Sequence, residues 1–219
     1  MKLISVNVSK PKPMSFQGKT VLTGIFKQSM EGRLHVGRLN LEGDQQADLS
    51  VHGGPHQAVY VYPFEHYASW QQELGRDDFT FGQFGENFTV SGMLENQVCI
   101  GDVFRVGSAL FQVTQPRVPC FKLATKMGST EFPKLFMASA RTGFYLRVME
   151  EGDVGAGDPI VLEGKNSLGM TVESFFRLAF FDQENVAKLR EAVCIASLSP
   201  GWQRRFEDRL EELGEKTNL

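Results

Sequence analysis

The segment at residues 115–123, QPRVPCFKL, contains the side chain best suited to chemistry in this sequence. Cys120 directly follows Pro119, and Arg117 and Lys122 lie a few positions away. Neighbouring cations lower the pKa of a thiol, and the resulting thiolate is both a nucleophile and a ligand for soft metals. The alternative is a buried structural cysteine. Because the segment is polar and bounded by prolines, we predict a chemical role for Cys120.

The other two cysteines have apolar neighbours. Cys99 alternates with Val98 and Ile100 in a predicted strand, and Cys194 lies in an apolar helical stretch, so we predict that both belong to the core. The three cysteines are odd in number and far apart in sequence, which argues against a disulfide framework and indicates a reduced protein.

The segment VHGGPH at residues 51–56 places His52 and His56 four positions apart. On a helix this spacing would put both imidazoles on one face, where they could bind zinc, but the intervening Gly-Gly-Pro excludes a helix. Glycines instead let backbone N–H groups approach an anion closely. A functional turn and a plain hairpin connection both remain open.

Asn87, in the segment GENFT at residues 85–89, is a third candidate. Its carboxamide both donates and accepts hydrogen bonds, which suits a cofactor pocket, but asparagine serves turns equally well. By itself this residue does not distinguish a cofactor pocket from a turn.

Charge is unevenly distributed along the chain. Residues 1–40 carry seven basic side chains against Glu31 alone, and residues 103–147 carry seven against Glu131 alone. The intervening residues 41–102 carry ten acidic side chains against Arg76. The two basic segments could fold together into one anion-binding cleft, or their lysines and arginines could simply face solvent.

Several classes of protein are excluded by composition. A net charge of −3 argues against a general nucleic-acid binder, and the longest apolar runs are too short to span a bilayer. The first residues show no secretory signal. We therefore expect a cytoplasmic protein with no nucleic-acid or membrane partner. The sequence contains no dinucleotide-binding, Walker, nucleophile-elbow or four-cysteine iron–sulfur motif.

The first 165 residues consist mainly of short segments rich in Val, Ile, Phe and Leu, punctuated by Gly, Asp and Pro. This pattern of short apolar segments predicts a barrel-like sheet. Two helices are predicted within it, at 63–74 with Tyr67, Trp70 and Leu74 on one stripe, and at 129–140, where Pro133 interrupts the pattern. The predicted strands are 3–8, 20–26, 33–41, 58–62, 97–106, 109–115, 144–150 and 158–163.

After Lys165 the spacing becomes helical, with three amphipathic segments at 171–181, 182–195 and 199–213. Asp182 and Ser199 are the predicted N-caps, and Pro200 is expected in the first turn of the last helix. The predicted fold class is therefore β-rich α+β, with a barrel-like β-domain over residues 1–166 and a three-helix domain over 167–219. The helices should pack on the sheet and supply no metal ligand.

These segments together resemble the MOSC domain family, named after the C-terminal domain of molybdenum-cofactor sulfurases, and most closely its bacterial YiiM-type members. The resemblance extends over nearly the whole chain, including the three-helix tail. It is carried by TGIFK (23–27), LEGDQQAD (41–48), VHGGP (51–55), YPFEHYASW (62–70), FGENFT (84–89), IGDVFRVG (100–107) and QPRVPCFKL (115–123).

The resemblance implies a barrel-like fold that binds the molybdenum cofactor, a pterin with dithiolene sulfurs and a phosphate. The family's signature cysteine falls on Cys120, which would complete the coordination of molybdenum. Lys27 and Arg117 are the expected phosphate ligands, followed by Arg141. The pocket is expected to include Thr23, Asn87 and His52, and His52 is also a catalytic candidate. His56 stands where the family usually has aspartate, so the role of that acid is in doubt here.

Reduction of N-hydroxylated compounds, including purine bases, is the activity that the resemblance implies, as a detoxification reaction. The chain lacks flavin and iron–sulfur motifs, so electrons would come from a separate flavoprotein reductase. Pyridoxal phosphate binding is a further implied property. Two alternatives remain: a molybdenum-cofactor carrier or sulfur relay without turnover, and a zinc or cysteine hydrolase using His52, His56 and Cys120.

Overall fold

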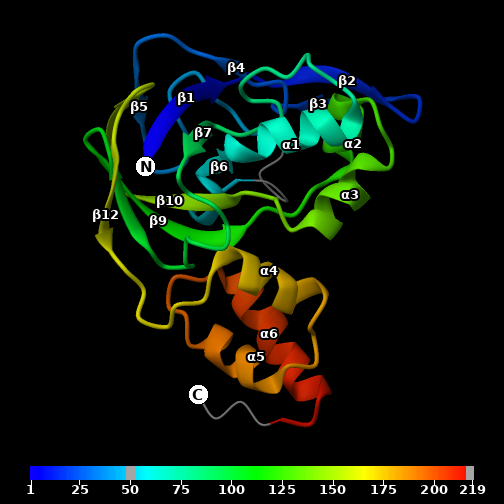
Figure 1. Cartoon of the computed structure of the whole chain (residues 1–219), viewed down its shortest axis with the longest axis vertical. Helices are drawn as coiled ribbons and strands as arrows, with labels where there is room; N and C mark the ends of the chain where they lie inside the picture. The colour runs from blue at the N-terminus through cyan, green and yellow to red at the C-terminus, as the bar shows by residue number, and fades with distance from the viewer. Residues whose placement is uncertain (48–52, 216–219) are drawn as a thin grey trace.

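The computed structural model describes residues 1–47 and 53–215 and is dominated by one eight-stranded sheet with the strand order β12-β8-β9-β10-β6-β7-β1-β4. All neighbours in this sheet are antiparallel except β6 and β7, which are parallel and joined by a connection that contains α1. Two small two-stranded sheets, β2-β3 and β5-β11, lie beside it (Figure 1).

The bounds of the strands are β1 Lys2–Val8, β2 Lys12–Phe16, β3 Lys19–Thr23, β4 Gln28–Ser29, β5 Arg33–Val36, β6 Val59–Pro63, β7 Phe88–Ser91, β8 Val103–Val106, β9 Ala109–Pro116, β10 Phe144–Glu150, β11 Gly152–Gly155 and β12 Ile160–Gly164. The helices are α1 Glu65–Leu74, α2 Phe121–Met127, α3 Phe132–Ser139, α4 Val172–Phe180, α5 Val186–Val193 and α6 Pro200–Glu212, with one 3₁₀ turn, η1, at Pro55–Gln57.

The large sheet curls toward closure without becoming a barrel. Backbone hydrogen bonds join Met1 and Leu3, at the start of β1, to residues 157–160 beside β12. These hydrogen bonds amount to an isolated bridge between Lys2 and Pro159 and not to a continuous ladder between β1 and β12. Over the described residues no ladder closes the sheet, so the predicted barrel is corrected to an open, strongly curved sheet. The β-rich α+β class itself is confirmed.

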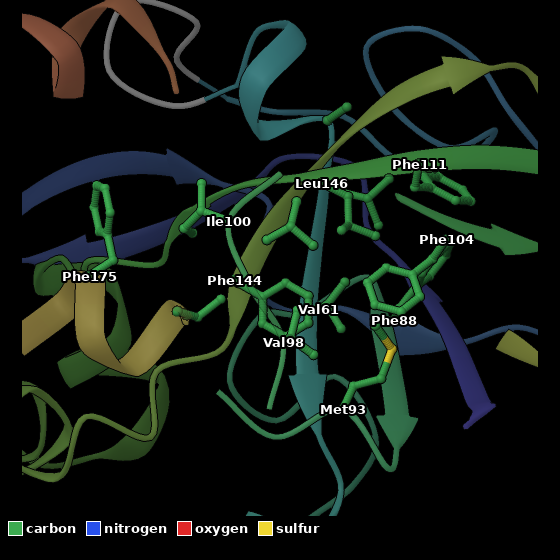
Figure 2. Packing of buried hydrophobic residues seen from close by; sticks show 14 of the residues in the cluster. Val61, Phe88, Met93, Val98, Ile100, Phe104, Phe111, Phe144, Leu146 and Phe175 are labelled. Carbon is green, nitrogen blue, oxygen red and sulfur yellow. The ribbon is translucent and has the colours of Figure 1, made fainter. Parts of the chain in front are cut away.

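The inward faces of this sheet form the main hydrophobic core, which continues into the helical tail. Phe88 and Phe111 meet edge to face with 5.6 Å between ring centroids (Figure 2). Phe175 of α4 belongs to the same cluster and packs on Trp202 and Phe206 of α6, at 5.1 and 5.0 Å. Helices α4–α6 lie together at one end of the molecule, beyond β9 and β10 (Figure 1). The division at residues 166/167 into two domains stays a prediction.

A second, aromatic cluster lies between β6, α1 and α3. Tyr67 and Trp70 are the buried members of the predicted α1 stripe. Trp70 donates its indole N–H to the hydroxyl of Tyr62 over 2.7 Å, and Phe136 of α3 stacks against both rings. Phe136 of this cluster lies against Arg117, in the segment that follows β9, with 5.6 Å between the ring centre and the guanidinium carbon.

Local details differ from the sequence-based expectations for identifiable reasons. Helix α2 was not predicted because it is only seven residues long and begins directly after Cys120. Pro133 lies in the first turn of α3, where its missing N–H costs nothing, and so begins the helix instead of interrupting it. The N-cap of α5 is Asn185, whose side chain accepts a hydrogen bond from the backbone N–H of Lys188, and not Asp182.

The predictions for Cys99 and Cys194 have different outcomes. Cys99 is buried, as expected, whereas Cys194 is exposed at the C-terminal end of α5, so its assignment to the core was wrong. The apolar neighbours of Cys194 face inward while the cysteine itself lies on the opposite side of the turn. In the part of the chain that the structure describes, no helix has the length and apolar character needed to cross a membrane.

Candidate functional site

A cavity of about 110 Å³ opens where segments distant in sequence meet. Its walls come from the end of β3 and the chain after it, the loop at residues 44–47, the start of β6, the segment after β9, and β10. The polar and reactive lining residues are Thr23, Lys27, Asp44, Gln45, Gln46, Gln57, Tyr60, Asn87, Arg117, Cys120, Lys122 and Tyr145. Five of the seven residues that the resemblance assigns to the cofactor are therefore brought together: Thr23, Lys27, Asn87, Arg117 and Cys120.

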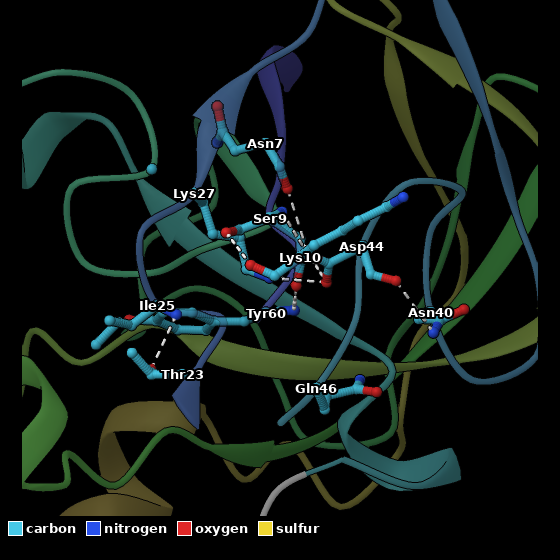
Figure 3. Close-up of polar contacts among 12 residues, drawn as sticks. Asn7, Ser9, Lys10, Thr23, Ile25, Lys27, Asn40, Asp44, Gln46 and Tyr60 are labelled. Atoms are coloured by element: carbon cyan, nitrogen blue, oxygen red, sulfur yellow. Dashed lines mark hydrogen bonds and ion pairs between the residues drawn. The ribbon is translucent and has the colours of Figure 1, made fainter. Parts of the chain in front are cut away.

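Asp44 is the centre of the polar network on one wall. Its carboxylate oxygens lie 2.5 and 2.7 Å from Nζ of Lys27, in an ion pair whose two side chains are almost completely buried. Asp44 also accepts a hydrogen bond from the backbone N–H of Ser9 at 2.8 Å (Figure 3). A further hydrogen bond reaches it from Nδ2 of Asn87 at 2.9 Å. Burial lowers the pKa of Lys27, and the attraction of Asp44 opposes that effect.

Asn87 and Thr23 are held by the protein's own backbone. The carboxamide of Asn87 accepts from the N–H of Tyr60 at 3.1 Å and donates to the carbonyl of Asn7 at 3.2 Å, in addition to Asp44. The hydroxyl of Thr23 accepts from the N–H of Ile25 at 3.2 Å (Figure 3). Both side chains thus fix the shape of the wall. These hydrogen bonds account for their position in the cavity, and no ligand is needed to explain it.

Arg117 is a buried charge on the cavity wall. It is 5% exposed, and its guanidinium carbon lies 5.0 Å from the ring centre of Tyr60 and 5.6 Å from that of Phe136. Its Nη1 has no hydrogen-bond partner among the described residues. No ion pair joins Arg117 to a carboxylate over residues 1–47 and 53–215.

The tyrosines beside Arg117 do not neutralise it. Burial opposes its charge, while interaction with Tyr60, Tyr145 and Cys120 outweighs that effect and raises the pKa of Arg117. Burial also raises the pKa values of Tyr60 and Tyr145 themselves. Both phenols are therefore neutral near pH 7, and Arg117 remains a buried cation without a formal counter-charge from the described carboxylates.

The position of Arg117 depends on a close backbone crossing. The backbone N–H of Arg117 donates to the carbonyl of Gly143 over 3.1 Å. Gly143 has φ +67°, and a Cβ there would lie 2.3 Å from the carbonyl oxygen of Val61. Only glycine fits, so this residue lets β6, β10 and the segment after β9 converge on the cavity.

Cys120 lies at the N-terminal cap of α2, half-buried and on the cavity wall. Lys122, in the first turn of that helix, is 8% exposed and lines the same wall. Arg117 and Lys122 thus flank Cys120 with positive charge, and a cationic setting favours the thiolate form of a cysteine.

The loop at residues 82–86 is held in place by the buried carboxylate of Glu86. Its oxygens accept from the N–H groups of Gly82 and Phe84, both at 2.9 Å, from the hydroxyl of Thr89 at 3.0 Å and from the hydroxyl of Tyr67. Lys126 of α2 ties this loop to the chain after β3, donating to the carbonyls of Ile25 at 2.9 Å and Gly82.

The buried Lys126 is expected to give the protein a specific pH dependence. Burial lowers its pKa from 10.5 to about 8, so between these values the unfolded chain binds more protons than the folded one and stability rises with pH. In Lys126→Met this rise should shrink by about 1–3 kcal/mol. Urea unfolding of both proteins at about pH 7.5 and about pH 10 measures it. Parallel changes in the two proteins would show that Lys126 does not titrate in this range.

Two predicted site residues lie elsewhere or outside the described chain. Arg141 does not line the cavity; its guanidinium pairs with the carboxylate of Glu73 at 2.8 Å and lies 4.0 Å from the ring centre of Trp70. His52 falls within residues 48–52 and lies outside the described residues. His56 follows on η1 and lines a separate cavity. Within residues 1–47 and 53–215, no group of three or more His, Cys, Asp or Glu side chains is arranged to hold a metal ion.

Sequence reasoning missed Asp44, Tyr60 and Tyr145, and it gave Lys122 only as a cation near Cys120. Asp44 and Lys122 both fall within the motifs LEGDQQAD and QPRVPCFKL, so the signal was present. The two tyrosines sit on β6 and β10, where their alternation looks like that of ordinary strand residues.

Comparison with known proteins identifies the family. The model described as MOSC domain matches residues 48–161, more than half of the chain. The chain belongs to the MOSC domain family. The YiiM-like 3-alpha helix domain matches residues 170–213, which contain α4–α6.

Two relatives of this MOSC protein cover nearly its whole length. The chain is 41% identical to the uncharacterized protein YflK of Bacillus subtilis over 96% of this chain and 95% of that one. It is similar to the crystal structure of YiiM from Geobacillus stearothermophilus, with a TM-score of 0.81, 33% identity, and 95% and 98% of the two chains covered. A protein named reductase from Gibberella moniliformis is 32% identical over 73% of this chain and 29% of its own. These descriptions name no substrate and do not mention pyridoxal phosphate.

Proposed function

We propose that this MOSC protein binds the molybdenum cofactor through Cys120 and uses it to reduce N-hydroxylated compounds such as N-hydroxylated purine bases. The observation that carries the proposal is Arg117, a buried guanidinium without a carboxylate partner among the described residues, on the same cavity wall as Cys120. A buried charge needs a counter-charge, so a bound anion accounts for it.

The residues present fit such a cofactor in two ways. Cys120 offers a sulfur donor, which is the ligand type suited to a soft metal. Arg117 offers an unpartnered Nη1, and a guanidinium binds phosphate with directed hydrogen bonds. Lys122 adds a second cation on this wall. Lys27 is already paired with Asp44, so we assign it to shaping the wall and not to gripping the phosphate.

When bound, the cofactor supplies a metal centre that accepts and donates electrons in pairs. Cleaving an N–OH group consumes two electrons and two protons and releases water. The chain's own contribution is to hold the anionic end with Arg117 and Lys122 and to place a sulfur at Cys120. Nζ of Lys27, 2.5 Å from Asp44, holds exchangeable protons at the cavity wall.

The electrons are proposed to come from a separate flavoprotein reductase in the cytoplasm. The fungal relative named reductase supports oxidoreductase chemistry, and it is much longer than the part that aligns with this chain. The present sequence has no flavin or iron–sulfur motif.

The test is to purify the full chain from cells that make molybdenum cofactor and measure bound molybdenum and pterin. The protein is then assayed with an N-hydroxylated purine, NADH and a flavoprotein reductase. Bound cofactor with reduction to the amine supports the proposal. Bound cofactor without turnover would identify a carrier, and zinc in place of molybdenum would favour a hydrolase.

Replacing Arg117 with methionine separates a ligand role from a structural one. Loss of a hydrogen bond to a charged group costs about 1.5–3 kcal/mol, so cofactor retention should fall about 10- to 100-fold. The free energy of unfolding of the cofactor-free protein should be unchanged or higher, because the variant removes a buried charge.

Arg141→Met is the matched control for this variant. Arg141 also lies against an aromatic ring, but it has Glu73 as a partner and does not line the cavity. It should retain the cofactor. Molybdenum content and urea unfolding are measured on both variants. If Arg117→Met keeps its molybdenum while losing stability, the guanidinium is structural and the proposed anion site is wrong.

A further inference from the structure

A second cavity, of about 400 Å³, lies between the sheet and the helical tail and adjoins the first. Gly53 and Gln57 line both cavities. Its remaining walls are Pro55, His56 and Gln115 on the sheet side, and Ser199, Gly201, Trp202 and Arg205 from α6 and its N-cap. This volume lies in the usual range of small-molecule sites.

The sheet side of this cavity holds buried polar atoms that pair with no other described residue. Gln115 is 5% exposed, and its Oε1 has no hydrogen-bond partner among residues 1–47 and 53–215. Nδ1 of His56 is also buried without a partner in the described chain. Burial and the nearby Arg147 lower the pKa of His56, so the imidazole is neutral near pH 7. A buried amide without a partner is costly, which points to a ligand that pairs with it.

The helical side offers a rigid planar wall. The guanidinium of Arg205 lies 4.8 Å from the ring centres of both Trp202 and Phe180 and donates to the carbonyl of Ala179 at 2.9 Å. Ser199 is the N-cap of α6, but its side chain makes no capping hydrogen bond. No carboxylate is found among the described residues that line this cavity.

These groups together favour a flat heterocycle over a simple anion. A glutamine carboxamide donates and accepts side by side and pairs with the amino group and ring nitrogen of an aminopurine. A fixed guanidinium and an indole edge complement a flat, electron-rich ring. A lone phosphate would use Arg205 and leave the acceptor of Gln115 unpaired.

We propose that the second cavity binds the ring of a purine-type base, with Gln115 pairing with its polar edge and with Arg205 and Trp202 forming its wall. This inference rests on the proposed function, since the bound base would present its N-hydroxyl group toward the cavity of Cys120. The helical tail thereby supplies part of the substrate site while contributing no metal ligand.

The experiment measures binding without turnover. The full chain without cofactor is labelled with ¹⁵N-tryptophan, which gives two indole signals, from Trp70 and Trp202. Trp202→Phe assigns them. Titration with adenine should shift the Trp202 signal saturably, while the signal of Trp70, buried in the other cluster, stays still.

Variants test the named contacts. Gln115→Leu and Arg205→Met should each weaken adenine binding about tenfold, the effect expected for one lost hydrogen bond or stacking contact. Arg204→Met is the matched control because Arg204 is exposed on α6 like Arg205 but does not line this cavity. It should bind adenine like the unaltered protein. Circular dichroism confirms that each variant is folded.

The inference would be overturned by no shift of Trp202 with adenine, by unaltered adenine affinity in both Gln115→Leu and Arg205→Met, or by an equal response to inorganic phosphate. Loss of adenine binding in cofactor-loaded protein would also overturn it, because the cavity would then belong to the cofactor. Adenine binding with no reduction of an N-hydroxylated base would instead contradict only the proposed function.

Discussion

Cys120→Ser is expected to lose the proposed reductase activity by more than about 100-fold, because even a group that only supports a metal ligand costs about 10–100-fold when it is changed. Serine keeps the size of the side chain but replaces a soft sulfur donor with a hard oxygen, which suits molybdenum poorly. Bound molybdenum should fall together with activity. The measurements are metal analysis of the purified protein and reduction of an N-hydroxylated purine.

Cys194→Ser is the control for this variant, because Cys194 is exposed at the end of α5 and remote from the cavity walls. It should keep both metal and activity. Cys99→Ser should also stay active, although that residue is buried in the core. Normal activity in Cys120→Ser would refute the proposed mechanism.

Asp44→Asn is expected to lower the free energy of unfolding by about 3–5 kcal/mol, the cost of breaking a buried ion pair from one side. The variant would leave Lys27 buried without its counter-charge and weaken the hydrogen bonds that Asp44 accepts from Ser9 and Asn87. Urea unfolding at neutral pH measures the loss. Adding Lys27→Met should recover part of it, because the stranded cation is then removed.

Asp78→Asn provides the matched comparison. Asp78 pairs with Arg76 at 2.7 Å, but its side chain is 62% exposed, so its loss should cost less than about 1 kcal/mol. If Asp44→Asn were as mild as Asp78→Asn, the Lys27–Asp44 pair would not be the centre of the cavity wall.

Local sequence patterns determined most of the secondary structure. Alternation predicted β9, whose Ala109, Phe111 and Val113 point into the core, and helical spacing predicted all three tail helices. These features depend on neighbours one to four positions apart, which the sequence shows directly. Short elements such as α2 were missed because so few residues carry no clear period. The polar, proline-bounded setting of Cys120 could also be identified from the sequence, although the role of this cysteine stays a prediction.

Only the tertiary structure decided the state of each charge. The family resemblance made Lys27 and Arg117 the first candidates for binding one anion, followed by Arg141. Folding places Asp44 against Lys27 and Glu73 against Arg141, and it buries Arg117 beside neutral tyrosines. Partners 17 and 68 positions apart in sequence have no local signature, and the burial that makes an unpaired charge costly exists only after the sheet has curled around the cavity.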